Sequence, residues 1–190
     1  MNTFSIATWN VNSLRVRLPQ LAEWLTAVQP DIVALQETKL PDADFPAAEI
    51  QALGYQVTYS GQRTYNGVAV LSRAPLTPIA TDIPGFVDEQ RRVLAVETQG
   101  CIVVDLYVPN GQEPGSDKYA YKLRWLEALR GWLVELHKLG RPLIVLGDFN
   151  IAPEDRDVHD PIAWQGSVHV SEPERHAFAR LLETGLVDVF

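Results

Sequence analysis

The stretch FSIATWNVNSLRVRLPQLAEWLTAVQPDIVALQE, residues 4–37, decides the fold class. Its two ends, residues 4–10 and 30–37, are short apolar runs typical of buried strands. Between them, apolar side chains recur at helical spacing over residues 17–29, which predicts an amphipathic helix. A strand, a helix and a second strand over so short a length predict a βαβ unit with a parallel pair of strands.

The central part of the chain predicts strands that pair in the antiparallel manner. Five short runs rich in valine and isoleucine follow one another between residues 55 and 109, separated by turn residues. The dipeptides Asn66-Gly67 and Gln99-Gly100 are typical of β-hairpin turns. Together with the βαβ unit, these runs predict an α/β fold with both parallel and antiparallel strands.

Three further elements are predicted toward the end of the chain. Residues 116–140 form the clearest helix, because leucines recur there in steps of three and four. Residues 141–150 read as another buried strand. Residues 171–186 predict a helix whose first turn holds a capping box of Ser171 and Glu174.

Composition indicates one domain over residues 1–190, since 46% of the 190 residues are hydrophobic, enough for a substantial core. A net charge of −8 argues against a protein that is held to nucleic acid by bulk charge, although a local basic track is compatible with it. The single cysteine, Cys101, fits a reducing compartment and a buried apolar role. With no signal peptide and no apolar run of membrane-spanning length, we expect a cytoplasmic protein without a membrane partner.

Polar side chains follow three of the apolar runs at the point where each run ends. We expect them to converge on one cleft if the three strands are neighbours, because sites in parallel sheets form beyond the carboxyl ends of the strands. Each residue also has a plainer interpretation, since asparagine and aspartate commonly make turns and a glutamate can end an exposed strand. The residues are Asn10 and Asn12, Gln36 and Glu37, and Asp148 and Asn150.

Such a cluster predicts a site for a hard cation. Carboxylate and amide oxygens suit Mg²⁺ or Mn²⁺, and no Cys–His spacing argues for zinc. A hard cation with open coordination positions is the usual equipment for moving a phosphoryl group.

Six motifs carry a resemblance to a known family. They are TWNVNSLR, LQETK, NGVAVLSR, YVPNG, KYAYKLRW and LGDFNIAP, in that order. With them the whole chain resembles the exonuclease III family of DNA-repair nucleases, within the endonuclease/exonuclease/phosphatase superfamily. The resemblance implies a two-sheet α/β sandwich with helices on the outer faces. It also implies a Mg²⁺-dependent phosphodiesterase that acts on duplex DNA as a 3′–5′ exonuclease, removes blocking groups from 3′ ends and incises at abasic sites.

The resemblance assigns roles to matching positions. It implies that Glu37 is the metal ligand with Asn10 beside it, and that Asp148 orients or deprotonates the attacking water. Asn150 would help to place that water or the phosphate, and Tyr107 would contact the phosphate. Asn110 would line the same pocket. For Tyr107 the alternative is an aromatic side chain that packs on the core at a strand end.

Other positions match residues that face DNA in the family: Asn12, Arg15, Lys39 and Tyr65. Solvated turns and edges are the alternative, and we prefer it for Lys39 and Tyr65. A basic group of Arg91, Arg92, Lys118, Lys122 and Arg124 also offers phosphate contacts, but we expect a solvated face there.

The sequence departs from the family pattern in two ways. The family continues beyond Phe190 with further strands and an Asp–His pair, so the resemblance implies that the domain is incomplete at its C-terminus and that its last strands are missing. Some relatives have a small residue where His169 stands in a loop that faces DNA. An imidazole there would crowd a flipped-out abasic nucleotide, which favours processing of 3′ ends and nicks over abasic incision. The alternative for His169 is a loop residue in solvent.

The expected partner is therefore duplex DNA with nicks, 3′ blocks or abasic sites, bound by a monomer. Two other functions stay open. One is a superfamily phosphatase that acts on inositol or lipid head groups. The other is a catalytically silent DNA-binding or assembly fragment.

Overall fold

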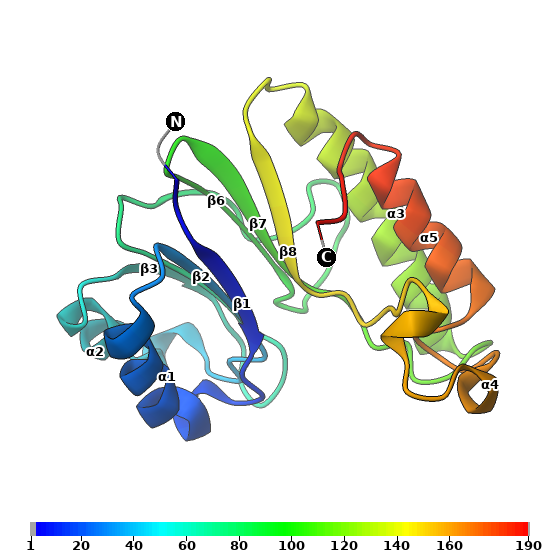
Figure 1. Cartoon of the computed structure of the whole chain (residues 1–190), viewed down its shortest axis with the longest axis horizontal. Coiled ribbons are helices and arrows are strands. Elements are labelled where there is room, and N and C mark those ends of the chain that lie inside the picture. Colours follow the sequence, from blue (N-terminus) through cyan, green and yellow to red (C-terminus); the bar gives the residue numbers. More distant parts are fainter. Residues whose placement is uncertain (1–2, 190) are drawn as a thin grey trace. The chain divides into compact units, whose positions relative to one another are not determined.

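The computed structural model describes residues 3–189, and contacts within the chain divide it into two compact units. The first unit comprises Met1–Asp82, Val87–Tyr107 and Arg141–Asp148. The second comprises Ile83–Phe86, Val108–Gly140 and Phe149–Phe190. All strands of the described residues belong to the first unit (Figure 1).

The first unit contains two four-stranded sheets, and both are mixed. In spatial order, sheet A holds β1 (Ile6–Asn10), β2 (Ile32–Gln36), β4 (Val68–Ser72) and β3 (Gln56–Ser60). Sheet B holds β5 (Thr77–Ala80), β6 (Val93–Thr98), β7 (Cys101–Tyr107) and β8 (Leu143–Asp148). The pairs β1–β2 and β7–β8 are parallel, and the other neighbours are antiparallel. The predicted βαβ unit is therefore confirmed.

The two sheets pack face to face through a buried apolar layer. Alternate residues of β2 and β4 meet alternate residues of β6 and β7 there, as the period of two in a strand requires. The fully or nearly buried members of this layer are Ile32, Val68, Val70, Leu94, Val96, Cys101 and Val103. The prediction that Cys101 is a buried apolar residue is confirmed, and burial raises the pKa of its thiol.

Helices cover the other face of sheet A. The helix α1 (Leu14–Val28) buries Leu14, Leu21 and Leu25 against that face, and α2 (Ala47–Ala52) adds Ile50. A short 3₁₀ turn, η1 (Asp42–Asp44), precedes α2. The leucines of α1 recur at helical spacing because one stripe of the helix faces the sheet.

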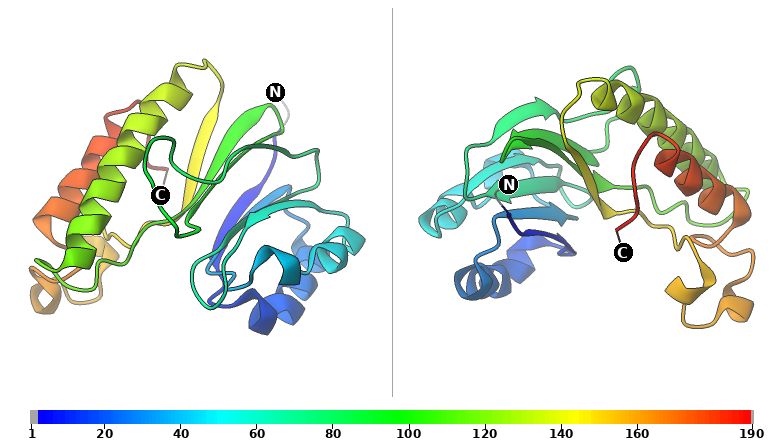
Figure 2. Two further views of the ribbon diagram at one scale, coloured as in Figure 1. Left: turned by 180° about the vertical axis from the view of Figure 1, so that it is seen from behind. Right: turned by 45° about the horizontal axis from the view of Figure 1, so that its top comes forward.

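The second unit is built around two helices that run side by side, α3 (Asp117–His137) and α5 (Glu172–Leu182) (Figure 2). They run in the same direction, since Lys122 pairs with Glu174 and Glu127 with Arg180. The capping box of Ser171 and Glu174 is confirmed. Between the two helices in sequence lie η2 (Asp155–Asp157) and α4 (Pro161–Trp164).

One predicted turn differs from the structure. Gln99 and Gly100 form a two-residue hairpin between β6 and β7, with φ of 53° and 80°, as expected. Asn66 and Gly67 also have positive φ, but they end a longer connection, residues 61–67, between β3 and β4. Among the described residues, no helix combines the length and apolar character that crossing a membrane requires.

Candidate active site

The carboxyl ends of strands from both sheets meet at one place in the first unit. Asn10 ends β1 and Asp148 ends β8, and the Nδ2 atom of Asn10 donates a 2.7 Å hydrogen bond to Oδ2 of Asp148. The same nitrogen lies 2.9 Å from Oε1 of Glu37, which follows β2. From the sequence, this convergence is expected if β1, β2 and β8 are neighbours in one sheet. Only β1 and β2 are, because β8 belongs to sheet B. The side chains nevertheless converge, since the two sheets face each other.

A glycine brings Asp148 to this place. Gly147 pairs with Leu106 across β7 and β8, at a φ of 133°. A β-carbon on Gly147 would lie 2.0 Å from the carbonyl oxygen of Leu106, so only glycine allows so close an approach. Tyr107 and Asp148 form the next pair between β7 and β8. The two residues therefore lie side by side at the ends of their strands, at the site.

Glu37 reaches the site through an unusual backbone conformation. Along β2, Val33 and Leu35 face the helices, and Ile32 faces sheet B. A continued strand would turn Glu37 toward the helices. Glu37 instead has a φ of 55°, in the left-handed region that few non-glycine residues occupy, and its side chain meets Asn10.

Tyr107 completes the cluster, and it is held on two sides. Its hydroxyl donates a hydrogen bond to Glu37. The guanidinium of Arg92 lies 4.6 Å from the centre of the Tyr107 ring and donates a 3.1 Å hydrogen bond to the Tyr107 carbonyl. Arg92 was expected on a solvated face, and the structure shows that it packs on Tyr107 instead.

The charges of the cluster follow from these contacts. Burial raises the pKa of Glu37, but hydrogen bonds from Lys39, Asn10 and Tyr107 outweigh burial and hold it below its ordinary value of 4.5. Burial and the nearby Glu37 charge raise the pKa of Tyr107 to about 12. Glu37 is therefore ionised and Tyr107 protonated at neutral pH.

The donors fit a hard cation with open positions. Two carboxylates, Glu37 and Asp148, share one amide neighbour, and the Glu37 side chain is 19% exposed. Within residues 3–189 no group of three or more His, Cys, Asp or Glu is placed to enclose a metal. One or two carboxylates with solvent access is the arrangement that Mg²⁺ uses. Asn10 turns its nitrogen to the carboxylates, because its Oδ1 accepts from the Asn12 backbone at 3.0 Å.

The predicted DNA-facing residues of the first unit divide into two groups. Lys39 lies at the cluster, with Nζ 2.9 Å from Oε2 of Glu37 and 2.5 Å from Oδ1 of Asn12. Arg15 instead lies 3.7 Å from Asp44, and Tyr65 is 67% exposed. Lys39 is thus a partner of the acidic cluster as well as a candidate for DNA contact.

The remaining predicted residues lie in the second unit, where they share contacts with one another. Nδ2 of Asn110 lies 2.9 Å from Nε2 of His169. Lys122 donates to the backbone carbonyls of Asn110 at 3.2 Å and Asn150 at 2.6 Å. The Nδ2 atom of Asn150 donates to the Val108 carbonyl at 2.9 Å.

Lys122 corrects an expectation. It was assigned to a solvated face with Lys118 and Arg124, which are exposed, but Lys122 is completely buried. Its Nζ lies 2.5 Å from Oε1 of Glu174, which is also completely buried. The sequence pattern already indicated this burial, because Lys122 lies one helical turn before Leu126 and so continues the buried stripe of Leu126 and Leu129.

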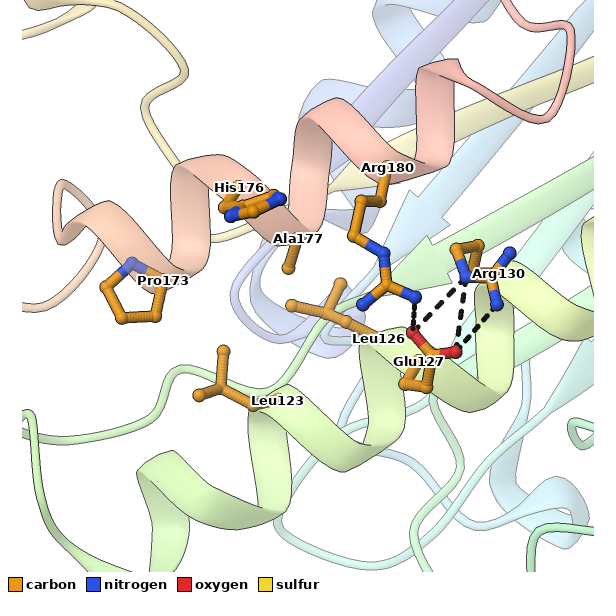
Figure 3. Close-up of a pocket in the computed structure, with 8 residues that line it drawn as sticks. All are labelled: Leu123, Leu126, Glu127, Arg130, Pro173, His176, Ala177 and Arg180. Atoms are coloured by element: carbon orange, nitrogen blue, oxygen red, sulfur yellow. Dashed lines mark hydrogen bonds and ion pairs between the residues drawn. The ribbon is translucent and has the colours of Figure 1, made fainter.

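A groove between α3 and α5 in the second unit has a cavity volume of about 270 Å³ (Figure 3). Its basic side chains are already engaged, since Glu127 pairs with both Arg130 and Arg180. None of the predicted site residues lines it. Its walls are Leu123, Leu126, Glu127, Arg130, Pro173, His176, Ala177 and Arg180.

Comparison with known proteins agrees with this geometry. The model of the Endonuclease/Exonuclease/phosphatase family matches residues 7–180. An exodeoxyribonuclease of Bacillus subtilis (strain 168) is 34% identical, and the alignment covers 97% of this chain and 73% of that protein. The solved 3′ phosphatase NExo from Neisseria, bound to a product DNA hairpin, is 43% identical with a TM-score of 0.90 over 98% of this chain and 73% of its own. An AP endonuclease from Archaeoglobus fulgidus is 37% identical with a TM-score of 0.95 over the same shares. These likenesses confirm the two-sheet α/β sandwich.

Proposed function

The chain belongs to the endonuclease/exonuclease/phosphatase family, and we propose from this premise that it hydrolyses phosphodiester bonds of duplex DNA with Mg²⁺. It is a DNA-repair nuclease, as its exodeoxyribonuclease and AP endonuclease relatives indicate. The observation that carries the proposal is the cluster of Glu37 and Asp148 around the Asn10 amide.

We assign the roles as follows. Glu37 holds the cation, with Asn10 fixing the carboxylate beside it. When bound there, Mg²⁺ would supply positive charge for a phosphate oxygen and for the leaving oxygen. Asp148 orients or deprotonates the attacking water. Tyr107, protonated at neutral pH, donates a hydrogen bond to the phosphate once DNA is bound.

The DNA-binding residues complete the proposal. Asn12, Arg15, Lys39 and Tyr65 of the first unit, and Asn110, Asn150 and His169 of the second, are the candidates for contacts to DNA and to the scissile phosphate. Local contacts of this kind position a duplex on a protein whose net charge is −8. We further propose a cytoplasmic monomer in which residues 1–190 belong to one nuclease domain.

We propose that 3′ ends and nicks are the preferred substrates. Nε2 of the His169 imidazole lies 2.9 Å from Nδ2 of Asn110, and this contact orients the ring in its loop. An imidazole in this place would occupy room that a flipped-out abasic nucleotide needs. The 43% identical Neisseria relative, which is a 3′ phosphatase, supports this preference.

The test is cleavage of three labelled duplexes, with Mg²⁺ and with EDTA. The duplexes carry a nick with a 3′ phosphate, a recessed 3′ end or an internal abasic site. We expect Mg²⁺-dependent processing of the first two, its loss in Asp148→Ala, and a gain of abasic incision in His169→Gly. Unchanged incision by His169→Gly would contradict the proposed preference.

The same assay separates the other functions. Release of phosphate from an inositol phosphate, without DNA cleavage, would favour a phosphatase. Binding of the duplex by a folded chain without cleavage would favour a silent DNA-binding protein. Either result would overturn the proposed nuclease activity.

A further inference from the structure

A second polar layer lies next to the site, inside the first unit. The side-chain amide of Gln36 donates to Oδ1 of Asp105 at 2.6 Å and to Oγ1 of Thr8 at 3.0 Å. Gln36 is 1% exposed and Asp105 is completely buried. Gln36 belongs to β2 and Asp105 to β7, so their hydrogen bond joins the two sheets.

Each member of this layer lies within two residues of a residue of the site. Thr8 comes two residues before Asn10 on β1, and Asp105 comes two residues before Tyr107 on β7. Gln36 directly precedes Glu37. Side chains two residues apart lie on the same face of a strand. Thr8 and Asp105 are therefore on the same face of their strands as Asn10 and Tyr107, and the layer lies directly next to the site.

Stability alone does not explain these residues. Asp105 is completely buried, and its carboxyl receives a side-chain hydrogen bond from Gln36 beside backbone groups of Leu35, Ala69 and Leu106. Removing a carboxyl from water into an otherwise apolar layer costs free energy, which an apolar side chain at the same position would not. Local rules of this kind are broken mainly at functional sites.

Among the residues of the site, Glu37 has a backbone conformation that needs support. Its φ of 55° is unfavourable for a side chain other than glycine and persists only where the surroundings determine it. On one side the buried Gln36 carbonyl accepts from the Val11 amide at 3.0 Å. The Glu37 carbonyl then accepts from the Ser13 amide at 2.8 Å. On the other side Thr38 is 1% exposed.

We propose that Asp105 and Gln36 are positioning residues, whose buried hydrogen bond between the sheets holds Glu37 in its left-handed conformation with the carboxylate facing Asn10. The inference rests on the proposed function in taking Glu37 as the metal ligand. Asp105 itself touches neither the cation nor DNA. It acts through Gln36 on the backbone at the end of β2.

The first experiment follows hydrogen exchange of the Val11 and Ser13 amides in Asp105→Ala, Asp105→Asn and Thr98→Val. Thr98 is the matched control, because it makes a buried 2.9 Å hydrogen bond to Ser72. Ser72 pairs with Ile32 at the opposite end of β2. We expect exchange at least tenfold faster in Asp105→Ala only, since asparagine keeps an acceptor for Gln36.

The second experiment measures the dissociation constant for Mg²⁺ by isothermal titration calorimetry. We expect at least a threefold increase in Asp105→Ala, and values close to wild type in Asp105→Asn and Thr98→Val. Should Asp105→Ala fail to fold, Gln36→Met removes the same hydrogen bond at nearly constant volume. In cleavage assays kcat falls while KM for DNA stays unchanged, because the DNA-facing side chains are untouched.

Equal effects of Asp105→Ala and Thr98→Val on exchange and on Mg²⁺ would show a merely structural role and overturn the inference. So would a loss in Asp105→Asn as large as in Asp105→Ala. If wild type binds no Mg²⁺ and cleaves no DNA, the proposed function fails. The exchange of the Val11 and Ser13 amides would still decide whether Asp105 holds Glu37 in place.

Discussion

The side-chain amide of Asn10 links the two sheets of the first unit, with its Nδ2 atom 2.7 Å from Oδ2 of Asp148. The same nitrogen donates to Glu37 at 2.9 Å, so one amide stands between two carboxylates. Asn10→Ala removes the hydrogen bonds, at a cost of about 1–3 kcal/mol. Asn10→Asp adds a third negative charge, which like charges nearby oppose.

We therefore expect Asn10→Asp to melt below Asn10→Ala in EDTA, and Mg²⁺ to raise its melting temperature more. For a chain of this size 1 kcal/mol corresponds to about 2–4 °C. Asn12→Asp is the matched control, because its new charge would lie beside the Lys39 ammonium. Equal melting of the two Asn10 variants in EDTA would contradict the prediction.

The Tyr107 hydroxyl should contribute, after Lys39 and Asn10, to the lowered pKa of Glu37. The pKa of Glu37 lies below 4.5, so its charge stabilises the fold above pH 4.5, and this contribution is lost as pH falls through the native pKa. Tyr107 has a pKa of about 12 and donates throughout this range. Tyr107→Phe removes one donor, so the Glu37 pKa should rise toward 4.5 in an NMR titration in EDTA. The exposed Tyr65→Phe should leave it unchanged, and an unchanged pKa in Tyr107→Phe would refute the assignment.

The pH dependence of the free energy of unfolding should show the raised pKa of Asp105. Burial raises its pKa well above 3.8, although the hydrogen bond from Gln36 lowers it. A raised native pKa gives stability that is present below pH 3.8 and is lost as pH rises toward the native pKa. Asp105→Asn cannot titrate, so its free energy of unfolding relative to wild type should increase as pH rises above 3.8 toward the native pKa of Asp105. Urea unfolding measures this, and a constant difference would count against a buried, protonated Asp105.

Gly147→Ala should displace Asp148 from the cluster. A β-carbon would lie 2.0 Å from the Leu106 carbonyl oxygen, so β8 must move away from β7. We expect cleavage to fall at least tenfold and the melting temperature to drop. Gly131→Ala is the control, because open space surrounds that position in α3 and alanine favours a helix by about 1 kcal/mol. Full activity of Gly147→Ala would show that β8 tolerates the shift.

Local patterns predicted much of this structure. The βαβ unit follows from spacing within residues 4–37, and the capping box from Ser171 and Glu174. Polar strand ends also led to Asn10, Glu37 and Asp148. Each of these signals lies within a short stretch of sequence or recurs at the ends of three strands.

The parts that were not predicted depend on tertiary packing. The contact between Asn10 and Asp148 joins strands of different sheets, and no local pattern reports sheet membership. The left-handed backbone of Glu37 depends on buried neighbours rather than on its own preference. Asp105 stands at an inward position of an otherwise apolar strand, and alternation along CIVVDLYV was a usable signal for it.

The buried Lys122 should matter for stability out of proportion to its single charge. It pairs with Glu174 at 2.5 Å, and both side chains are completely buried. Lys122→Met leaves the Glu174 carboxylate buried without its cation, which costs about 3–5 kcal/mol. The double variant Lys122→Met with Glu174→Gln removes both charges and should recover most of the loss in urea unfolding. The glutamine keeps an acceptor for the Ser171 amide, so the capping box survives.

Because Lys122 also donates to the carbonyls of Asn110 and Asn150, the double variant should still cleave DNA more slowly than wild type despite its recovered stability. Recovery of both stability and cleavage would show that the lysine serves the fold alone.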